Sequence, residues 1–141
     1  MHAVARVKIL YVEDDPDLCE AIVQILAMWG HEAVYFIRAR ELLKHLGTAG
    51  AEDFDLLITD YYVPDINGVD LIKLLRVSRP HLPAILLTGS REPSVLKAAS
   101  RIEDCEVMYK PLDMDQLLAR IEMHDGRCRD VQTHAAAQRT A

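Results

Sequence analysis

Short apolar runs alternate with longer amphipathic stretches along this chain. Five apolar runs have the length and composition of buried strands, and they cover residues 7–12, 32–37, 54–59, 84–88 and 106–109. Runs this short, separated by segments of a different period, are typical of a sheet whose strands are joined by helices. The pattern therefore predicts a five-stranded α/β sheet.

The segments between and after these runs carry apolar residues at helical spacing. They predict five helices, over residues 16–29, 40–46, 69–77, 93–100 and 113–121. The connections are too long for hairpins and suit right-handed parallel crossovers, which place helices on both faces of the sheet. In such doubly wound sheets ligands bind beyond the carboxyl ends of the strands.

Composition narrows the class of protein. The chain has 141 residues, of which 50% are hydrophobic and 27% charged, so we expect one folded domain. A formal net charge of -6 does not favour a broad electrostatic contact with nucleic acid or anionic lipid. No apolar run is long enough to cross a bilayer, and residues 1–6 lack the apolar segment of a signal peptide. We therefore expect a cytoplasmic protein that does not insert into a membrane.

Polar side chains follow four of the predicted strands at their carboxyl ends. Three acids occupy positions 13–15, Asp60 follows the third strand, Thr88 ends the fourth, and Lys110 follows the fifth. Clustered carboxylates repel one another unless a cation neutralises them, and oxygen ligands of this kind suit Mg²⁺. Taken singly, each residue is better explained as a helix cap, a turn or a solvated charge. Their joint occurrence at successive strand ends favours a binding site.

Four segments carry a specific pattern in a fixed order: ILYVEDDPDL at 9–18, DLLITDYYVPDINGVDL at 55–71, LLTGS at 86–90 and YKP at 109–111. In this order they resemble the receiver domain of bacterial response regulators, and the resemblance covers about residues 6–123. Pro64 and Gly68, four and eight residues after Asp60, fit the loop of that family. The resemblance implies a flavodoxin-like (βα)5 fold with strand order 2-1-3-4-5.

The same resemblance assigns roles to the acids. Asp60 corresponds to the phosphoacceptor, and Glu13 with Asp14 corresponds to the acidic pair of the family. Asp14 would then bind Mg²⁺ directly and Glu13 mainly through water, with Asp60 and the main-chain carbonyl of Tyr62 completing the protein ligands. Asp15 directly precedes Pro16, so we expect it to cap the first helix.

Lys110 and Thr88 complete the resemblance, since the lysine would contact the phosphoryl group and the threonine hydroxyl would move inward to bond it. The donor would be a phosphohistidine on a sensor histidine kinase or a histidine phosphotransfer protein. Phosphorylation would change the surface formed by the fourth helix, fifth strand and fifth helix, and this surface would control an unknown effector protein. The implied catalysis is limited to the domain's own phosphorylation and dephosphorylation.

The chain departs from the family pattern at the aromatic residue that usually takes part in the response to phosphorylation. The aromatic residue expected three positions before Lys110 is Val107, which has no ring to swing. Tyr109 shares a strand face with Val107, so we hypothesise that its ring partly substitutes for the missing aromatic switch. Backbone movement around Thr88 and the fourth helix could carry the signal instead. The alternative is that Tyr109 is a fixed surface ring. Tyr62 and Ser90 flank the point where water would enter to hydrolyse the acyl phosphate, so both are candidates for setting its lifetime. Tyr62 could slow this hydrolysis by covering the phosphoryl group, or it could be a solvent-facing loop ring.

Residues 1–124 are predicted to form the receiver and 125–141 a flexible tail too short for an output domain. The chain could be a free-standing protein or a piece of a larger regulator, and a homodimer stays open.

Two other functions compete with this interpretation. Residues 15–17 resemble the DxD motif of haloacid-dehalogenase-type phosphatases, which would make Asp15 the nucleophile, but the expected threonine is missing and Asp60 is unexplained. A pseudo-receiver that keeps the fold without phosphorylation is favoured by Val107 alone, because the other site residues are intact.

Overall fold

The computed structural model describes residues 6–49, 54–89 and 91–124. The predicted tail at 125–141 and Ser90 lie outside these residues. Five strands form one parallel sheet in the order β2-β1-β3-β4-β5. Their bounds are β1 (Lys8–Val12), β2 (Glu32–Phe36), β3 (Leu56–Asp60), β4 (Ala84–Thr88) and β5 (Cys105–Tyr109). The predicted doubly wound fold and its strand order are confirmed.

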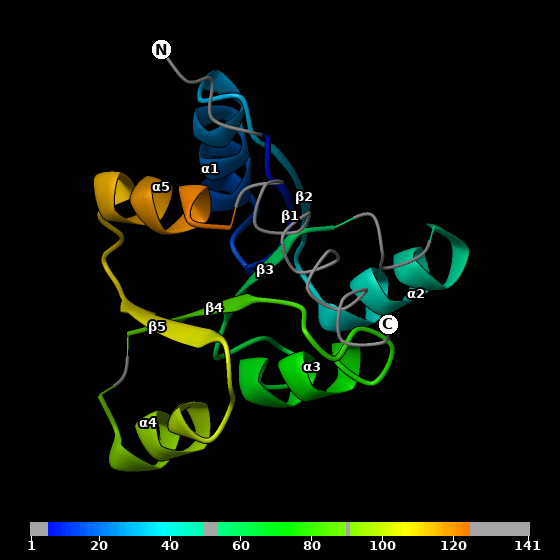
Figure 1. Ribbon diagram of the computed structural model, residues 1–141, viewed down its shortest axis with the longest axis vertical. Coiled ribbons are helices and arrows are strands. Elements are labelled where there is room, and N and C mark those ends of the chain that lie inside the picture. Colours follow the sequence, from blue (N-terminus) through cyan, green and yellow to red (C-terminus); the bar gives the residue numbers. More distant parts are fainter. Residues whose placement is uncertain (1–5, 50–53, 90, 125–141) are drawn as a thin grey trace, which may run out of the picture.

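Five helices connect or follow these strands (Figure 1). Their bounds are α1 (Pro16–Met28), α2 (Ala39–Ala49), α3 (Gly68–Leu75), α4 (Pro93–Ser100) and α5 (Met114–Glu122). Helices α1 and α5 cover one face of the sheet, and α2, α3 and α4 cover the other. This arrangement gives the domain two separate hydrophobic cores.

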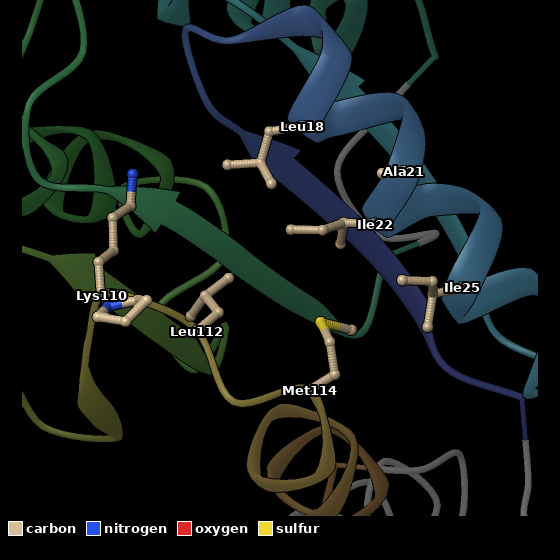
Figure 2. Close-up of a pocket in the computed structure, with 8 residues that line it drawn as sticks. Leu18, Ala21, Ile22, Ile25, Lys110, Leu112 and Met114 are labelled. Atoms are coloured by element: carbon tan, nitrogen blue, oxygen red, sulfur yellow. The ribbon is translucent and has the colours of Figure 1, made fainter.

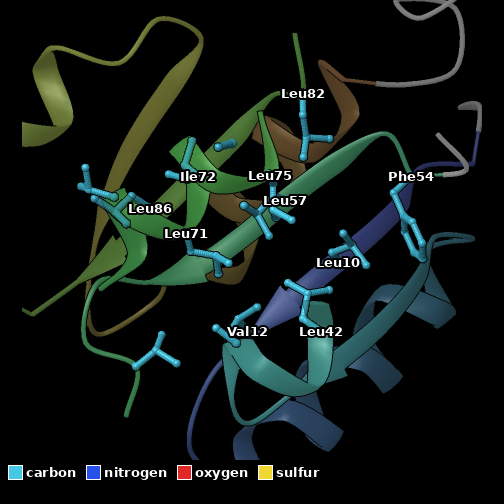
Figure 3. Close-up of a cluster of buried hydrophobic side chains, with 14 of the residues drawn as sticks. Leu10, Val12, Leu42, Phe54, Leu57, Leu71, Ile72, Leu75, Leu82 and Leu86 are labelled. Atoms are coloured by element: carbon cyan, nitrogen blue, oxygen red, sulfur yellow. The ribbon is translucent and has the colours of Figure 1, made fainter. Parts of the chain in front are cut away.

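The two cores follow from the alternation of side chains along each strand. On β1, Leu10 packs with α2 and α3, whereas Ile9 packs with α1 and α5. On β4, Leu86 and Ile85 divide in the same way. Figure 3 shows the first core, where leucines of the sheet meet those of α2 and α3. Burial on both faces explains the apolar runs of the central strands β1, β3 and β4.

Several predicted boundaries were wrong by one to three residues. Strand β3 includes Asp60 and begins at Leu56, and α3 spans Gly68–Leu75 and so ends before residue 77. Helix α2 is longer than predicted at both ends, over Ala39–Ala49. The first main-chain amides of α2 donate hydrogen bonds to the side chain of Asp65, which lies in a segment distant in the sequence.

Arg76 joins two connections at the amino-terminal edge of the sheet. It is the C-cap residue of α3, and its guanidinium donates hydrogen bonds to the main-chain carbonyls of Leu82, Glu103 and Asp104. The distances to Leu82 are 3.0 Å from Nε and 2.8 Å from Nη2. One side chain thus fixes the connection before β4 to the connection before β5.

Candidate functional site

The carboxyl ends of β1 and β3 bring three acids together. Glu13 and Asp14 directly follow β1, and Asp60 is the last residue of β3. One carboxylate oxygen from each of the three lies within 4.8 Å of the others. Glu13 is 2% exposed and Asp60 is 4% exposed, whereas Asp14 faces solvent. Two buried carboxylates and one exposed carboxylate therefore lie close together at the carboxyl ends of the strands.

Lys110 follows β5 and reaches both buried acids. Its Nζ lies 2.8 Å from Oδ2 of Asp60 and 3.3 and 3.2 Å from the two carboxylate oxygens of Glu13. The Lys110 side chain keeps about a third of its surface exposed, at 31%. Its main-chain N–H donates to the carbonyl of Thr88 at 2.9 Å, which fixes the start of the segment after β5 against β4. One ammonium group thus bridges the two buried carboxylates.

The electrostatics of Asp60 reflect this burial. Desolvation raises the pKa of Asp60 above its ordinary value, while the hydrogen bond and charge of Lys110 act in the opposite direction. Oδ2 is paired with Lys110, but Oδ1 is buried and has no hydrogen-bond partner within the described part of the chain. A buried carboxylate oxygen without a partner is costly, so this site favours an additional cation or donor.

Tyr11 adds a buried hydroxyl to the same region. The residue lies on β1 and is completely buried, on the face covered by α1 and α5. Burial raises its pKa, and the negative charge of Asp60 adds to the effect. Its hydroxyl has no hydrogen-bond partner among residues 6–49, 54–89 and 91–124. No role was predicted for this tyrosine, because it lies within the apolar run of the first predicted strand.

Thr88 ends β4 next to these groups. It is 2% exposed and pairs in the sheet register with Tyr109, the last residue of β5. The structure therefore brings the predicted set together, with Glu13, Asp14, Asp60, Thr88 and Lys110 at one edge of the sheet.

The loop after Asp60 approaches its own strand closely at Gly68. The Gly68 N–H donates to the carbonyl of Tyr61 at 2.7 Å. A Cβ at this position would collide with the carbonyl oxygen of Asp60 and with a methyl group of Leu86. Tyr62 is 58% exposed and forms an isolated bridge with Asn67. Glycine is needed at position 68 because the backbone of the phosphoacceptor candidate leaves no room for a side chain.

Asp65 fixes the same loop to a different helix. Its two carboxylate oxygens accept hydrogen bonds from the first amides of α2, those of Ala39 at 3.1 Å and Arg40 at 2.8 Å. Partial burial opposes ionisation, but these bonds together lower the pKa of Asp65 below its ordinary value. Asp65 was not predictable as a cap of this helix, since its partners lie 26 and 25 positions away in the sequence.

The switch candidates lie on β5. Val107 is half-buried and packs against the first core. Tyr109 is also half-buried, and the guanidinium carbon of Arg91 lies 4.0 Å from its ring centroid. The predicted lifetime residue Ser90 lies outside the described part of the chain.

Asp15 has the predicted capping role. Its Oδ1 accepts hydrogen bonds from the amides of Asp17 at 3.1 Å and Leu18 at 3.3 Å at the start of α1. This exposed position accounts for the Asp15–Asp17 motif as helix capping.

An apolar groove of about 310 Å³ lies between α1 and the start of α5. Figure 2 shows Ile22 and Ile25 of α1 on one side, Leu112 and Met114 on the other, and Lys110 at one end. The groove therefore begins beside the lysine that contacts Asp60.

Comparison with known proteins agrees with this geometry. Residues 9–122 match the family model described as the response regulator receiver domain. The chain belongs to this family. Receiver domains are in general signalling domains without an enzymatic activity on other molecules, and they act with sensor kinases and downstream effectors. They typically bind Mg²⁺ at an acidic pocket, which corresponds here to the cluster of Glu13, Asp14 and Asp60.

Relatives of this receiver domain include the response regulator protein FleR of Pseudomonas aeruginosa, 34% identical over 83% of this chain and 24% of FleR. The transcriptional regulatory protein CrdR of Helicobacter pylori is 32% identical over 82% of this chain and 53% of CrdR. The chain thus spans a quarter to a half of these proteins.

A solved receiver domain protein from Clostridium thermocellum superposes with a TM-score of 0.79 at 25% identity, covering 89% of this chain and 98% of that one.

Within the described residues, no helix is long and apolar enough to cross a bilayer.

Proposed function

We propose that this receiver domain accepts a phosphoryl group on Asp60 from a phosphohistidine and passes the change to a partner protein. A carboxylate oxygen of Asp60 attacks phosphorus, the bond from phosphorus to the imidazole nitrogen breaks, and its electron pair stays on the imidazole. Both reacting groups are anionic, so positive charge at the site is the main requirement of the reaction.

The observation that carries this proposal is the position of Lys110. Its Nζ contacts Asp60 at 2.8 Å while it also pairs with Glu13. A cation held at this point neutralises part of the charge that accumulates when an anionic phosphoryl group approaches Asp60. About a third of the Lys110 side chain is exposed, so its ammonium group has room to move from the Asp60 carboxylate to the oxygens of the phosphoryl group.

The donor set also fits Mg²⁺. Glu13, Asp14 and Asp60 offer only oxygen ligands, and Oδ1 of Asp60 is buried without a partner in the described residues. We assign the direct contact to Asp14 and Asp60 and a water-mediated contact to Glu13, with the main-chain carbonyl of Tyr62 as a further ligand. When bound, Mg²⁺ would screen the phosphoryl oxygens and the acidic pair.

Thr88 and the surface around β5 carry the response. The Thr88 hydroxyl bonds a phosphoryl oxygen once Asp60 is modified, and α4, β5 and α5 then present a different surface to the effector. The domain's catalysis is confined to its own phosphorylation and to loss of the phosphoryl group. The exposed ring of Tyr62 lies two residues after Asp60, and we assign it a part in limiting water access.

The groove between α1 and α5 is the proposed contact for the phosphohistidine donor. Its walls are apolar and Lys110 stands at its end, so a protein docked there would present its histidine close to Asp60. This docking mode would use helix α1 and the segment before α5, and it leaves the readout surface of α4 accessible. We infer a sensor histidine kinase or a histidine phosphotransfer protein as the donor.

Labelling with acetyl phosphate tests this function. The folded chain should gain the mass of one phosphoryl group in Mg²⁺ and none in excess EDTA, measured by intact mass spectrometry. Asp60→Asn should abolish the gain, whereas Asp15→Asn should keep it. No gain by the folded wild-type chain would favour a pseudo-receiver, and loss in the Asp15 variant alone would favour the phosphatase.

A further inference from the structure

A contact between a cation and an aromatic ring joins the segments that follow β4 and β5. The guanidinium carbon of the exposed residue Arg91 lies 4.0 Å from the ring centroid of Tyr109. Such a contact is attractive because the negative face of the ring meets a positive charge. Planar guanidinium groups also stack well on aromatic faces, so the two side chains fit in shape as well as charge.

The contact lies next to the proposed phosphorylation site along both strands. Tyr109 pairs with Thr88 in the register of β4 and β5, and Lys110 directly follows it. Arg91 comes three residues after Thr88 in the chain. Arg91 is therefore close to Thr88 in the sequence, and the ring that it contacts belongs to the strand that leads directly into Lys110.

Strand β5 offers no other ring for this purpose. Its residues are Cys105, Glu106, Val107, Met108 and Tyr109, and Val107 packs its aliphatic side chain against the first core. Tyr109 is thus the one aromatic side chain of the strand, and its contact is made with the connection between β4 and α4.

We propose that Arg91 and Tyr109 form a latch that is closed while Asp60 is a free carboxylate and opens when Asp60 is phosphorylated. This proposal rests on the proposed function. The direct ion pair between Lys110 and Asp60 belongs to the free carboxylate, because an acyl phosphate replaces that charge. When the Thr88 hydroxyl bonds the phosphoryl group, the guanidinium of Arg91 leaves the ring of Tyr109.

The latch has a defined energetic consequence. An interaction present in one of two states shifts their equilibrium by its own free energy. A cation–π contact at an exposed position corresponds to about a two- to fivefold change in an equilibrium constant. Removing the latch should therefore strengthen binding of a phosphoryl mimic by about this factor, because the free state loses stability and the bound state does not.

Beryllofluoride with Mg²⁺ is a suitable probe, and its affinity for the full chain can be measured by titration calorimetry. Arg91→Gln and Tyr109→Leu should each bind it about two- to fivefold more tightly than wild type. The double variant should gain no more than either single variant, because both remove one contact. Tyr109→Phe keeps the ring face and should restore the lower affinity.

Lys97→Gln is the matched control, since it removes a positive charge from an exposed position of α4. It should leave the affinity within error of wild type. Unchanged or weaker binding by both Arg91→Gln and Tyr109→Leu would overturn the latch while the proposed function stands. Equal changes in affinity for Lys97→Gln and Arg91→Gln would also overturn the latch, because the effect would then come from the loss of a positive charge at any position. No binding by the folded wild-type chain would overturn the proposed function itself.

Discussion

Replacing Lys110 with methionine tests how the site holds two buried acids. The substitution keeps an unbranched side chain but removes the ammonium group that pairs with Glu13 and Asp60. Both carboxylates would then be buried with no cation between them, since Glu13 is 2% and Asp60 4% exposed. The Lys110→Met chain should be markedly less stable than wild type at neutral pH.

The magnitude follows from the geometry. Breaking a fully buried ion pair by removing one partner costs about 3–5 kcal/mol. Lys110 retains 31% of its side-chain exposure, so water screens part of the effect and the lower end, about 3 kcal/mol, is expected. With a urea slope of about 2 kcal/mol/M, the unfolding midpoint should fall by about 1.5 M. Circular dichroism during urea titration, without divalent cations, measures this shift.

The sign of the pH dependence adds a second check. Burial already raises the pKa of Asp60, and loss of Lys110 removes the group that opposes this shift. A carboxyl whose pKa is raised on folding contributes stability that is fully present below its unfolded pKa, about 3.9, and is lost as pH rises through its folded pKa. The difference between Lys110→Met and wild type should therefore shrink on acidification.

Lys97→Met supplies the control, because this exposed lysine of α4 should change stability by less than about 0.5 kcal/mol. A Lys110→Met chain as stable as wild type at neutral pH, or a difference that grows on acidification, would refute this reasoning about the buried acids.

Three further predictions concern the surroundings of the site. Gly68→Ala should lower the free energy of unfolding by about 1–3 kcal/mol, while Gly47→Ala, with open space around its Cβ, should leave it unchanged or raise it by up to about 1 kcal/mol; equal urea midpoints for the two variants would contradict the close approach. Asp65→Ala should cost about 1 kcal/mol at neutral pH, and since the pKa of Asp65 is lowered, the cost should vanish as pH falls through that pKa; a cost that persists in acid would argue against an ionised cap. Arg76→Ala should cost about 2–3 kcal/mol in thermal or urea unfolding, and a change under about 0.5 kcal/mol would show that its carbonyl contacts contribute little.

The sequence was sufficient to predict those features that depend on local spacing. Continuous apolar runs identified the strands because parallel strands are buried on both faces. The cap formed by Asp15 was predictable because its partners, Asp17 and Leu18, are two and three residues away. Convergence of Asp60 with the acids after β1 was predictable because parallel strands end at the same edge of the sheet.

Features that depend on distant contacts were not predictable in this way. No local pattern links Asp65 to the start of α2, so the start of that helix was predicted one residue too late. The stacking of Arg91 on Tyr109 joins two segments through sheet pairing, and neither side chain signals it alone. The need for Gly68 arises from the backbone of Asp60, which only the folded loop brings close.

The most direct test of the central claim is to locate the phosphoryl group at the level of a single residue. After treatment with acetyl phosphate and Mg²⁺, borohydride reduction converts an aspartyl phosphate to homoserine, and peptide mass spectrometry identifies the converted position. The account predicts conversion at Asp60 alone, in the peptide that contains the end of β3. Conversion at Asp14 or Asp15, or none in a chain shown to be folded, would contradict it.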